Sequence, residues 1–282
     1  MSMTRFVVVA LLFCALLPSA SVHANSEFDY LMGDIQKFEE DVQAHTEAES
    51  AAKKENLYQL SDDFFPIDEK RNEGGREFEP FVNVRIDGVP VDLTDVPSDT
   101  WFAPYIRDVA SLGIVSGYRG ADGRPLGLFG PDDSVTIEQL AKMAIEATGH
   151  ILSDCYDSQL RNESAKGSWS EQYILCAEHL GWAVYSDGSV VDASRPATRS
   201  EVVITALQSF DVLFGRALGT IFTDVTTSTE FSGAIERAAA DNVVSGYANS
   251  QGSPTGEFGP RDPVNRAAMA KILSLALQIY GQ

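Results

Sequence analysis

The stretch that decides the fold runs from residue 94 to residue 143 and reads TDVPSDTWFAPYIRDVASLGIVSGYRGADGRPLGLFGPDDSVTIEQLAKM. Shifted by 129 positions, it lies over residues 223–272 without a gap, and 21 of the 50 aligned positions are identical. Self-similarity at a fixed spacing is typical of proteins built from repeated structural units. The identities fall in short blocks: Thr-Asp-Val at 94–96 and 223–225, Val-Ser-Gly-Tyr at 115–118 and 244–247, Phe-Gly-Pro at 129–131 and 258–260, and Ala-Lys at 141–142 and 270–271.

A weaker copy lies between these two. Trp169–Ile174 aligns with Trp101–Ile106 at an offset of 68, and Thr198–Glu201 aligns with Thr136–Gln139 at an offset of 62. The loop in the middle copy is therefore six residues shorter. Three copies of about 55–65 residues fill the chain from residue 90 onward. We expect repeat units at residues 81–150, 151–219 and 220–282.

Each copy has the pattern of a helix, a loop and a second helix. The first helix places Tyr105, Ile106, Val109 and Ala110 on one face of a 3.6-residue period. A loop rich in Gly and Pro follows, and the second helix then begins at a capping residue. Thr136 with Gln139, and Thr198 with Glu201, form capping boxes, and Asn265 is a competent N-cap. One helix pair cannot bury its own apolar face, so we expect a mainly α-helical fold in which three copies share one core.

The first residues of the chain have the pattern of a secretory signal peptide. Arg5 precedes an apolar run from Phe6 to Leu17, and Val22-His23-Ala24 supplies small residues for cleavage. We expect a signal peptide at 1–24, with an uncleaved anchor as the alternative. No later window is long and apolar enough to span a bilayer, so we expect an exported protein without a transmembrane segment after cleavage.

Composition excludes several classes of partner and chemistry. The formal net charge is −20, so a phosphate backbone is repelled and no nucleic-acid partner is expected. No nucleophile elbow, phosphate loop or zinc-binding helix motif is present, and we expect no enzyme activity, cofactor or metal. Export leaves Cys155 and Cys176 as an even pair in an oxidising compartment. We expect them to form a disulfide, the alternative being two buried free thiols.

The segment before the repeats is acidic. Residues 25–80 hold 16 Asp and Glu against 6 Lys and Arg, and apolar residues recur in them at helical spacing. We expect a helical arm from about Ser26 to Leu60, followed by a linker at Glu69–Glu79. The arm is either a solvated helix or a segment that binds an unknown protein partner or associates with itself. Between Val82 and Val91, alternating residues flank Asp87-Gly88, which predicts a short β-hairpin.

Two arginines break a local rule. Arg199 and Arg266 each occupy the first position of a second helix, where a cation opposes the positive end of the helix dipole. Free amides, the dipole and a guanidinium at one place make a candidate anion site. We therefore expect Arg→Ala changes there to leave stability nearly unchanged. The alternative is an Arg that pairs with a loop carboxylate and holds two copies together.

These motifs, taken in order, resemble the S-layer homology (SLH) domain. The resemblance is carried by the Asp-Val opening, the Trp and Tyr-Ile of the first helix, Gly-Ile-Val-Ser-Gly-Tyr at 113–118, Phe-Gly-Pro, and Thr-Arg-Ser-Glu at 198–201. It covers roughly two thirds of the chain and implies three SLH copies arranged as a pseudo-threefold trimer. It also implies a non-enzymatic protein at the bacterial cell surface. Such a protein binds pyruvylated secondary cell-wall polysaccharide or a peptidoglycan-linked polymer.

The resemblance also implies roles for single residues. Arg199 and Arg266 would bind a pyruvyl carboxylate. The other implied polysaccharide-binding residues are Trp101 and Trp169 as groove walls, Asp95 and Asp224 as partners of sugar hydroxyls, and Gly117 and Gly246 as points of close approach. Each has a structural alternative: Trp in the core, Asp as a turn former, and Gly for a positive φ.

No copy keeps the whole set. Ile137 stands where the other copies have Arg, Glu230 stands where the first copy has Trp101, and Tyr185 stands where it has Gly117. Two functions therefore remain open. One is anchoring to anionic wall polysaccharide, and the other is a structural or adaptor role through protein contacts without polysaccharide binding.

Overall fold

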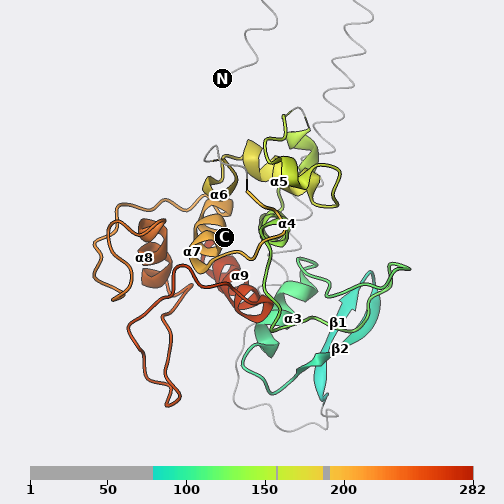
Figure 1. The fold of residues 1–282 in the computed structure, drawn as a ribbon. Helices are drawn as coiled ribbons and strands as arrows, with labels where there is room; N and C mark the ends of the chain where they lie inside the picture. The colour runs from blue at the N-terminus through green and yellow to red at the C-terminus, as the bar shows by residue number, and fades with distance from the viewer. Residues whose placement is uncertain (1–78, 157, 187–190, 282) are drawn as a thin grey trace, which may run out of the picture. The chain divides into compact units, whose positions relative to one another are not determined.

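The computed structural model describes residues 79–156, 158–186 and 191–281 (Figure 1). The expected signal peptide and all but the last two residues of the expected acidic arm lie outside the described residues. The described part contains seven α-helices and one two-stranded sheet, which agrees with the mainly helical fold predicted from the repeats. We call residues 81–150, 151–219 and 220–282 the first, middle and third segments.

The predicted hairpin is present and longer than expected. Strand β1 (Phe81–Ile86) pairs antiparallel with β2 (Val89–Pro97), and Asp87 and Gly88 form the turn with positive φ angles of 53° and 77°. Two positive φ angles are what a tight hairpin turn requires. Because β2 continues to Pro97, the Asp-Val opening of the first segment lies in a strand and does not form a turn.

The first helices of the three segments begin and end at aligned positions. They are α3 (Ala103–Ser111), α5 (Glu171–His179) and α8 (Ser232–Ala240). The offsets of 68 and 129 residues are those found in the sequence. The middle segment therefore follows the same register in its first helix, although its sequence has diverged most.

The second helices begin at the expected caps. They are α4 (Ile137–Thr148), α7 (Arg199–Ser209) and α9 (Arg266–Tyr280). Both capping boxes are formed, and the Asn265 side chain accepts from the Ala268 amide at 2.8 Å. A short helix, α6 (Ala183–Ser186), and two 3-10 turns, Leu152–Cys155 and Glu163–Ala165, belong to the middle segment.

A ring of three backbone hydrogen bonds joins the segments just before the second helices. The Val135 amide donates to the Val264 carbonyl at 2.8 Å, and the Val264 amide donates to the Ala197 carbonyl at 3.1 Å. The Ala197 amide closes the ring by donating to the Val135 carbonyl at 2.8 Å. These residues occupy aligned positions, and each buried amide finds its partner in another segment. The ring therefore needs all three segments.

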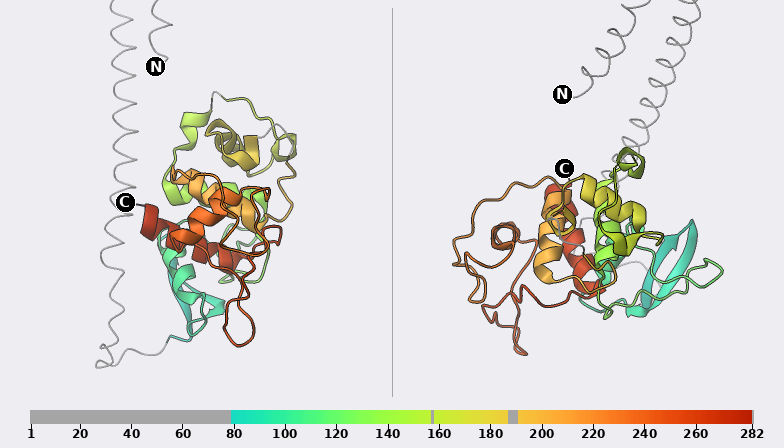
Figure 2. Two further views of the ribbon diagram at one scale, coloured as in Figure 1. Left: turned by 90° about the vertical axis from the view of Figure 1, so that its left-hand side faces the viewer. Right: turned by 45° about the horizontal axis from the view of Figure 1, so that its top comes forward.

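The helices pack between segments in the same cyclic order. The second helices α4, α7 and α9 contact one another, while α3 packs on α9, α5 on α4, and α8 on α7. Figures 1 and 2 show the second helices in the middle, with the hairpin and α8 on opposite sides of them. Each first helix thus covers the second helix of another segment. We call these contacts the α3–α9, α4–α5 and α7–α8 junctions.

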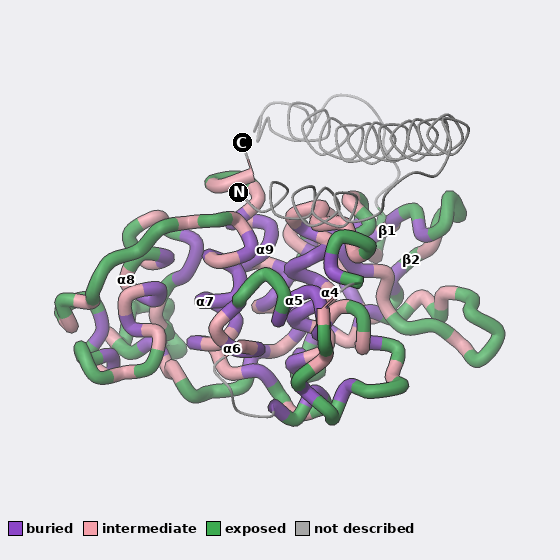
Figure 3. The backbone as a smooth tube through the Cα atoms, turned by 90° about the horizontal axis from the view of Figure 1, so that it is seen from above, coloured by how far each residue is buried: buried purple, intermediate pink, exposed green. Residues whose placement is uncertain are grey.

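The buried residues follow this arrangement. In Figure 3 the buried parts of the tube lie along the packed helices, whereas the long loops are mostly exposed. One continuous core joins the hairpin, the helices of all three segments and Phe129 and Phe258 of the loops. Among the residues that the structure describes, no helix has the length and apolarity needed to cross a membrane.

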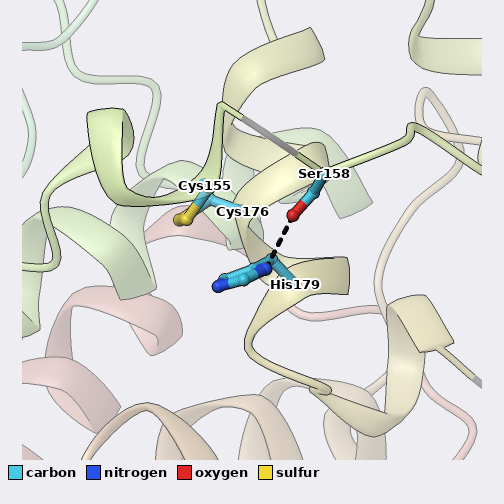
Figure 4. Close-up of a disulfide and its surroundings, with 4 residues drawn as sticks. All are labelled: Cys155, Ser158, Cys176 and His179. Carbon is cyan, nitrogen blue, oxygen red and sulfur yellow. Dashed lines mark hydrogen bonds between the residues drawn. A yellow bond between two sulfur atoms is a disulfide. The ribbon is translucent and has the colours of Figure 1, made fainter. Parts of the chain in front are cut away.

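The middle segment has its own supports. Cys155 and Cys176 lie with their sulfur atoms 1.95 Å apart, at bonding distance, and their Cα atoms 5.0 Å apart (Figure 4). Nearby, the Ser158 hydroxyl lies 2.6 Å from Nδ1 of His179. The buried carboxylate of Glu178 accepts the amides of Arg161 and Asn162, both at 2.8 Å. These contacts hold the loop that leads from α4 to α5.

Candidate functional site

The amides at the start of the second helices are not free. The first helical amides, those of Ile137, Arg199 and Arg266, donate to the carbonyls of Arg195, Asp262 and Asp133 at 2.9–3.1 Å. The second helical amides likewise donate to carbonyls of another segment, and the capping side chains accept the third. The expectation that free amides would bind an anion is therefore wrong. Only side chains remain available for that role.

Arg266 reaches from the third segment into the loop of the first. Its Nε donates to the carbonyl of Phe129 at 2.7 Å. The guanidinium carbon lies 5.1 Å from the ring centre of Tyr118 and 4.7 Å from that of Phe129. Only 8% of the residue is exposed. The guanidinium is thus held between two aromatic rings at the boundary of two segments.

Arg199 repeats this arrangement between the middle and third segments. Its Nε donates to the Phe258 carbonyl at 2.9 Å, and one of its Nη atoms donates to the Ser245 carbonyl at 3.1 Å. The guanidinium carbon lies 5.0 Å from the ring centre of Tyr247 and 4.6 Å from that of Phe258. The sites at Arg199 and Arg266 therefore have the same arrangement of carbonyl and aromatic contacts.

The charge of these sites is not neutralised by direct contact. Neither guanidinium forms an ion pair with a carboxylate of the described residues. Burial lowers the pKa of both Arg199 and Arg266, although nearby Asp side chains act in the opposite direction. An arginine stays protonated in proteins, so each site keeps a positive charge that an anion can pair with.

Each arginine site is framed by a Tyr–Asp pair. The Tyr118 hydroxyl donates to Asp133 at 2.7 Å, and the Tyr247 hydroxyl donates to Asp262 at 2.8 Å. Burial, and then the hydrogen bond to the carboxylate, raises the pKa of both tyrosines. The hydroxyls thus remain donors, and the pairs fix the rings over the guanidinium groups.

Asp95 and Asp224 already have backbone partners. The Asp95 carboxylate accepts the amides of Phe129 at 2.8 Å and Gly130 at 2.7 Å, and Asp224 accepts the equivalent pair at the same distances. Both carboxylates therefore hold the Phe-Gly-Pro loop that carries the arginine's carbonyl acceptor. This structural role differs from the turn-forming role expected as the alternative to sugar binding, because the amides that Asp95 accepts lie 34 and 35 residues away along the chain.

Gly117 and Gly246 allow two backbone segments of the same loop to lie in close contact. A Cβ on Gly117 would lie 2.4 Å from the Leu128 carbonyl oxygen, and one on Gly246 would lie 2.6 Å from that of Glu257. Gly117 also has a φ of 65°. The close approach expected at both glycines is therefore an approach between two parts of the protein's own backbone. It brings Tyr118 and Tyr247 to the arginines.

Trp101 and Trp169 are exposed and lie beside lysines of another segment. The two residues are 57% and 55% exposed. Nζ of Lys271 lies 5.9 Å from the Trp101 ring centre, and Nζ of Lys142 lies 5.9 Å from that of Trp169. The same lysines lie 5.8 and 5.7 Å from the ring centres of Tyr105 and Tyr173, respectively. Trp101 and Trp169 thus do not belong to the core, and each forms a surface cluster with a Tyr and a Lys.

The third arginine position is closed. Ile137 stands there with 0% exposure, and the hydroxyl of Tyr185 (1% exposed) donates to its carbonyl at 3.0 Å. The large ring of Tyr185 replaces the glycine that the first segment has at Gly117. The α4–α5 junction therefore has no arginine site of the kind found at the other two.

Several functional side chains were missed from the sequence. Tyr118, Phe129 and Lys271 were not singled out, and neither were their counterparts Tyr247, Phe258 and Lys142. All six belong to positions that are identical in the first and third segments. That identity was the available signal. Among the described residues, no group of His, Cys, Asp and Glu is arranged to hold a metal ion.

Comparison with known proteins identifies two of the segments. The family model of the S-layer homology domain matches residues 92–141 and 221–270. These matches fall on the first and third segments and leave the middle segment unmatched. No curated protein matches the chain significantly.

Proposed function

We propose that this protein is exported and anchored at the bacterial cell surface through an anionic wall polymer. S-layer homology domains typically anchor surface proteins to cell-wall polymers, and two such domains are present. The observation that carries the proposal is a pair of guanidinium groups that no described carboxylate contacts, that of Arg266, which is buried, and that of Arg199, which is partly buried. A carboxylate on the polymer, such as a pyruvyl ketal, has the charge and geometry to pair with them.

The middle segment completes the same architecture in this proposal. Its helices α5 and α7 follow the register of the matched domains, and Ala197 supplies one third of the backbone ring. We therefore infer that residues 151–219 are a third, diverged S-layer homology copy and that the three form a pseudo-threefold trimer. Arg199 comes from this copy. The arginine site at the α7–α8 junction therefore needs the middle segment as well as the matched third segment.

The roles of the candidate binding residues can be divided. Arg199 and Arg266 are the anion-binding residues, while Trp101 and Trp169 offer aromatic faces for sugar rings. Asp95 and Asp224, which accept backbone amides, and Gly117 and Gly246, which pack against carbonyls, act as positioning residues. They shape the loop on which each arginine rests.

A second function has two observations in its favour. The guanidinium groups also hold segments together through carbonyl bonds, and the α4–α5 junction has lost its arginine site. An envelope protein that uses its trimer for protein contacts alone would show both features. In that case the arginines would be purely structural.

Binding to purified sacculi separates the two functions. The mature chain is mixed with sacculi from the producing organism, either with the attached polymer or after the polymer has been removed. Anchoring predicts co-sedimentation with the first only, and loss of binding when soluble polymer is added. A protein that remains in the supernatant with both preparations would favour the adaptor function.

A further inference from the structure

The three junctions carry different sets of side chains. The aromatic–lysine cluster is complete at the α3–α9 junction and at the α4–α5 junction. At the α7–α8 junction all three positions have changed together, because Glu230, Ala234 and Ile204 stand where the other two have Trp, Tyr and Lys. Joint retention and joint loss indicate that the three side chains act as one unit.

The arginine sites follow another distribution. They are present at the α3–α9 junction with Arg266 and at the α7–α8 junction with Arg199. At the α4–α5 junction the site is closed by Ile137 and Tyr185. The two kinds of site have thus been lost independently, and only the α3–α9 junction has both.

The aromatic–lysine cluster has the chemistry of a sugar-binding surface. More than half of Trp101 is exposed, so its indole is available to stack on the apolar face of a sugar ring. Lys271 lies beside it without a carboxylate partner among the described residues, and its ammonium can pair with an acidic substituent. Lys271 and Arg266 are five residues apart in α9, about 7.5 Å along the helix axis and about 140° around it, so the two side chains leave the helix in different directions.

We propose that the α3–α9 junction is the principal binding site, with two subsites for one acidic polysaccharide, and that the other two junctions are half-sites. Arg266 binds one acidic group of the polymer, while Trp101, Tyr105 and Lys271 hold a neighbouring sugar and its charge. The α4–α5 junction keeps only the aromatic–lysine subsite, and the α7–α8 junction keeps only the arginine subsite. This inference rests on the proposed function and adds to it the junction and the second subsite.

The matched lysines test the inference directly. Lys271→Ala and Lys142→Ala remove the same contact at the principal site and at a half-site, and both lysines are only half-buried, so folding is little affected. We expect the dissociation constant for polymer-bearing sacculi to rise about tenfold or more for Lys271→Ala and less than about threefold for Lys142→Ala, as the loss of a charged hydrogen bond implies. Lys166→Ala, an exposed charge in the middle segment, is the control and should bind like the unchanged protein.

Each result has a distinct meaning. Equal losses for the two lysine variants would overturn the inference while leaving surface anchoring intact. Failure of the unchanged protein to sediment with polymer-bearing sacculi would overturn the proposed function and the inference with it. Combining Lys271→Ala with Arg266→Ala should abolish measurable binding, and retained binding by a protein with an unchanged far-ultraviolet spectrum would overturn the two-subsite arrangement.

Discussion

Arg266 donates its Nε to the carbonyl oxygen of Phe129 at 2.7 Å, across 137 positions of sequence. This contact joins the first helical residue of the third segment to the Phe-Gly-Pro loop of the first. The same relationship links Arg199 to Phe258 at 2.9 Å, between the middle and third segments. The arginines are therefore both structural contacts and candidate anion-binding groups. The expectation that their removal would leave stability unchanged has to be revised.

Arg266→Ala should lower the free energy of unfolding by about 1.5–3 kcal/mol, because the Phe129 carbonyl loses a charged donor in a buried place. Urea denaturation of the variant and of the unchanged protein measures this difference in the free energy of unfolding. Arg266→Lys keeps the positive charge but loses the planar guanidinium group. Its free energy of unfolding should therefore lie between those of the unchanged protein and of Arg266→Ala. An unchanged denaturation midpoint for Arg266→Ala would show that the carbonyl contact adds nothing to the fold.

Ile137→Arg should destabilise the protein by about 3–5 kcal/mol, since it places an unpaired charge in a fully buried position beneath Tyr185. Ile137→Val is the size control and should cost about 0.5–1.5 kcal/mol. Thermal melting compares the two variants. Stronger wall binding by a stable Ile137→Arg protein would instead show that a third arginine site can be restored.

Gly117→Ala should be much more costly than Gly123→Ala. Both glycines have positive φ angles, 65° and 80°, so both substitutions carry about 1–2 kcal/mol of backbone strain. Only at Gly117 does the added Cβ meet a carbonyl oxygen, at 2.4 Å, whereas nothing lies within 4 Å at Gly123. The extra clash should raise the cost at Gly117 to about 2–4 kcal/mol. Equal melting temperatures for the two variants would contradict the close approach of the loop strands.

Cys155 and Cys176 should be bonded in the exported protein. Thiol titration of the denatured, unreduced chain without its signal peptide should find no free thiol, and two free thiols would disprove the bond. Closing a loop of 21 residues is worth about 3 kcal/mol in the chain-entropy model. The reduced protein should therefore unfold at a lower urea concentration than the oxidised protein.

Stability should decrease in mildly acidic solution because of His150. Burial lowers the pKa of this imidazole below its usual 6.5, so the unfolded chain binds the proton more readily than the folded one. The stability contributed by the neutral ring is present above pH 6.5 and is lost as the pH falls through the folded-state pKa. His150→Gln should flatten this part of the profile of unfolding free energy against pH. A profile of unchanged slope would mean that other groups cause the pH dependence.

The sequence determined the elements of this fold. Local rules were enough to place the caps at Thr136, Thr198 and Asn265, because a capping side chain acts on amides within its own helical turn. The Asp87-Gly88 turn is local in the same way, and it was predicted together with its hairpin. Comparison of the chain with itself aligned α3, α5 and α8 residue by residue, since a repeated helix keeps its buried positions.

Only the tertiary structure decided what the arginines do and which junctions can bind. The amides at the helix starts are satisfied by carbonyls from another segment, and no rule about one helix reveals a partner that is distant in sequence. The same holds for Lys271 beside Trp101 and for Tyr185, whose hydroxyl donates to the Ile137 carbonyl. These contacts depend on the cyclic packing of α4, α7 and α9, which brings each loop against the second helix of another segment. The residue types were visible in the sequence, but their pairing is a property of the packed core.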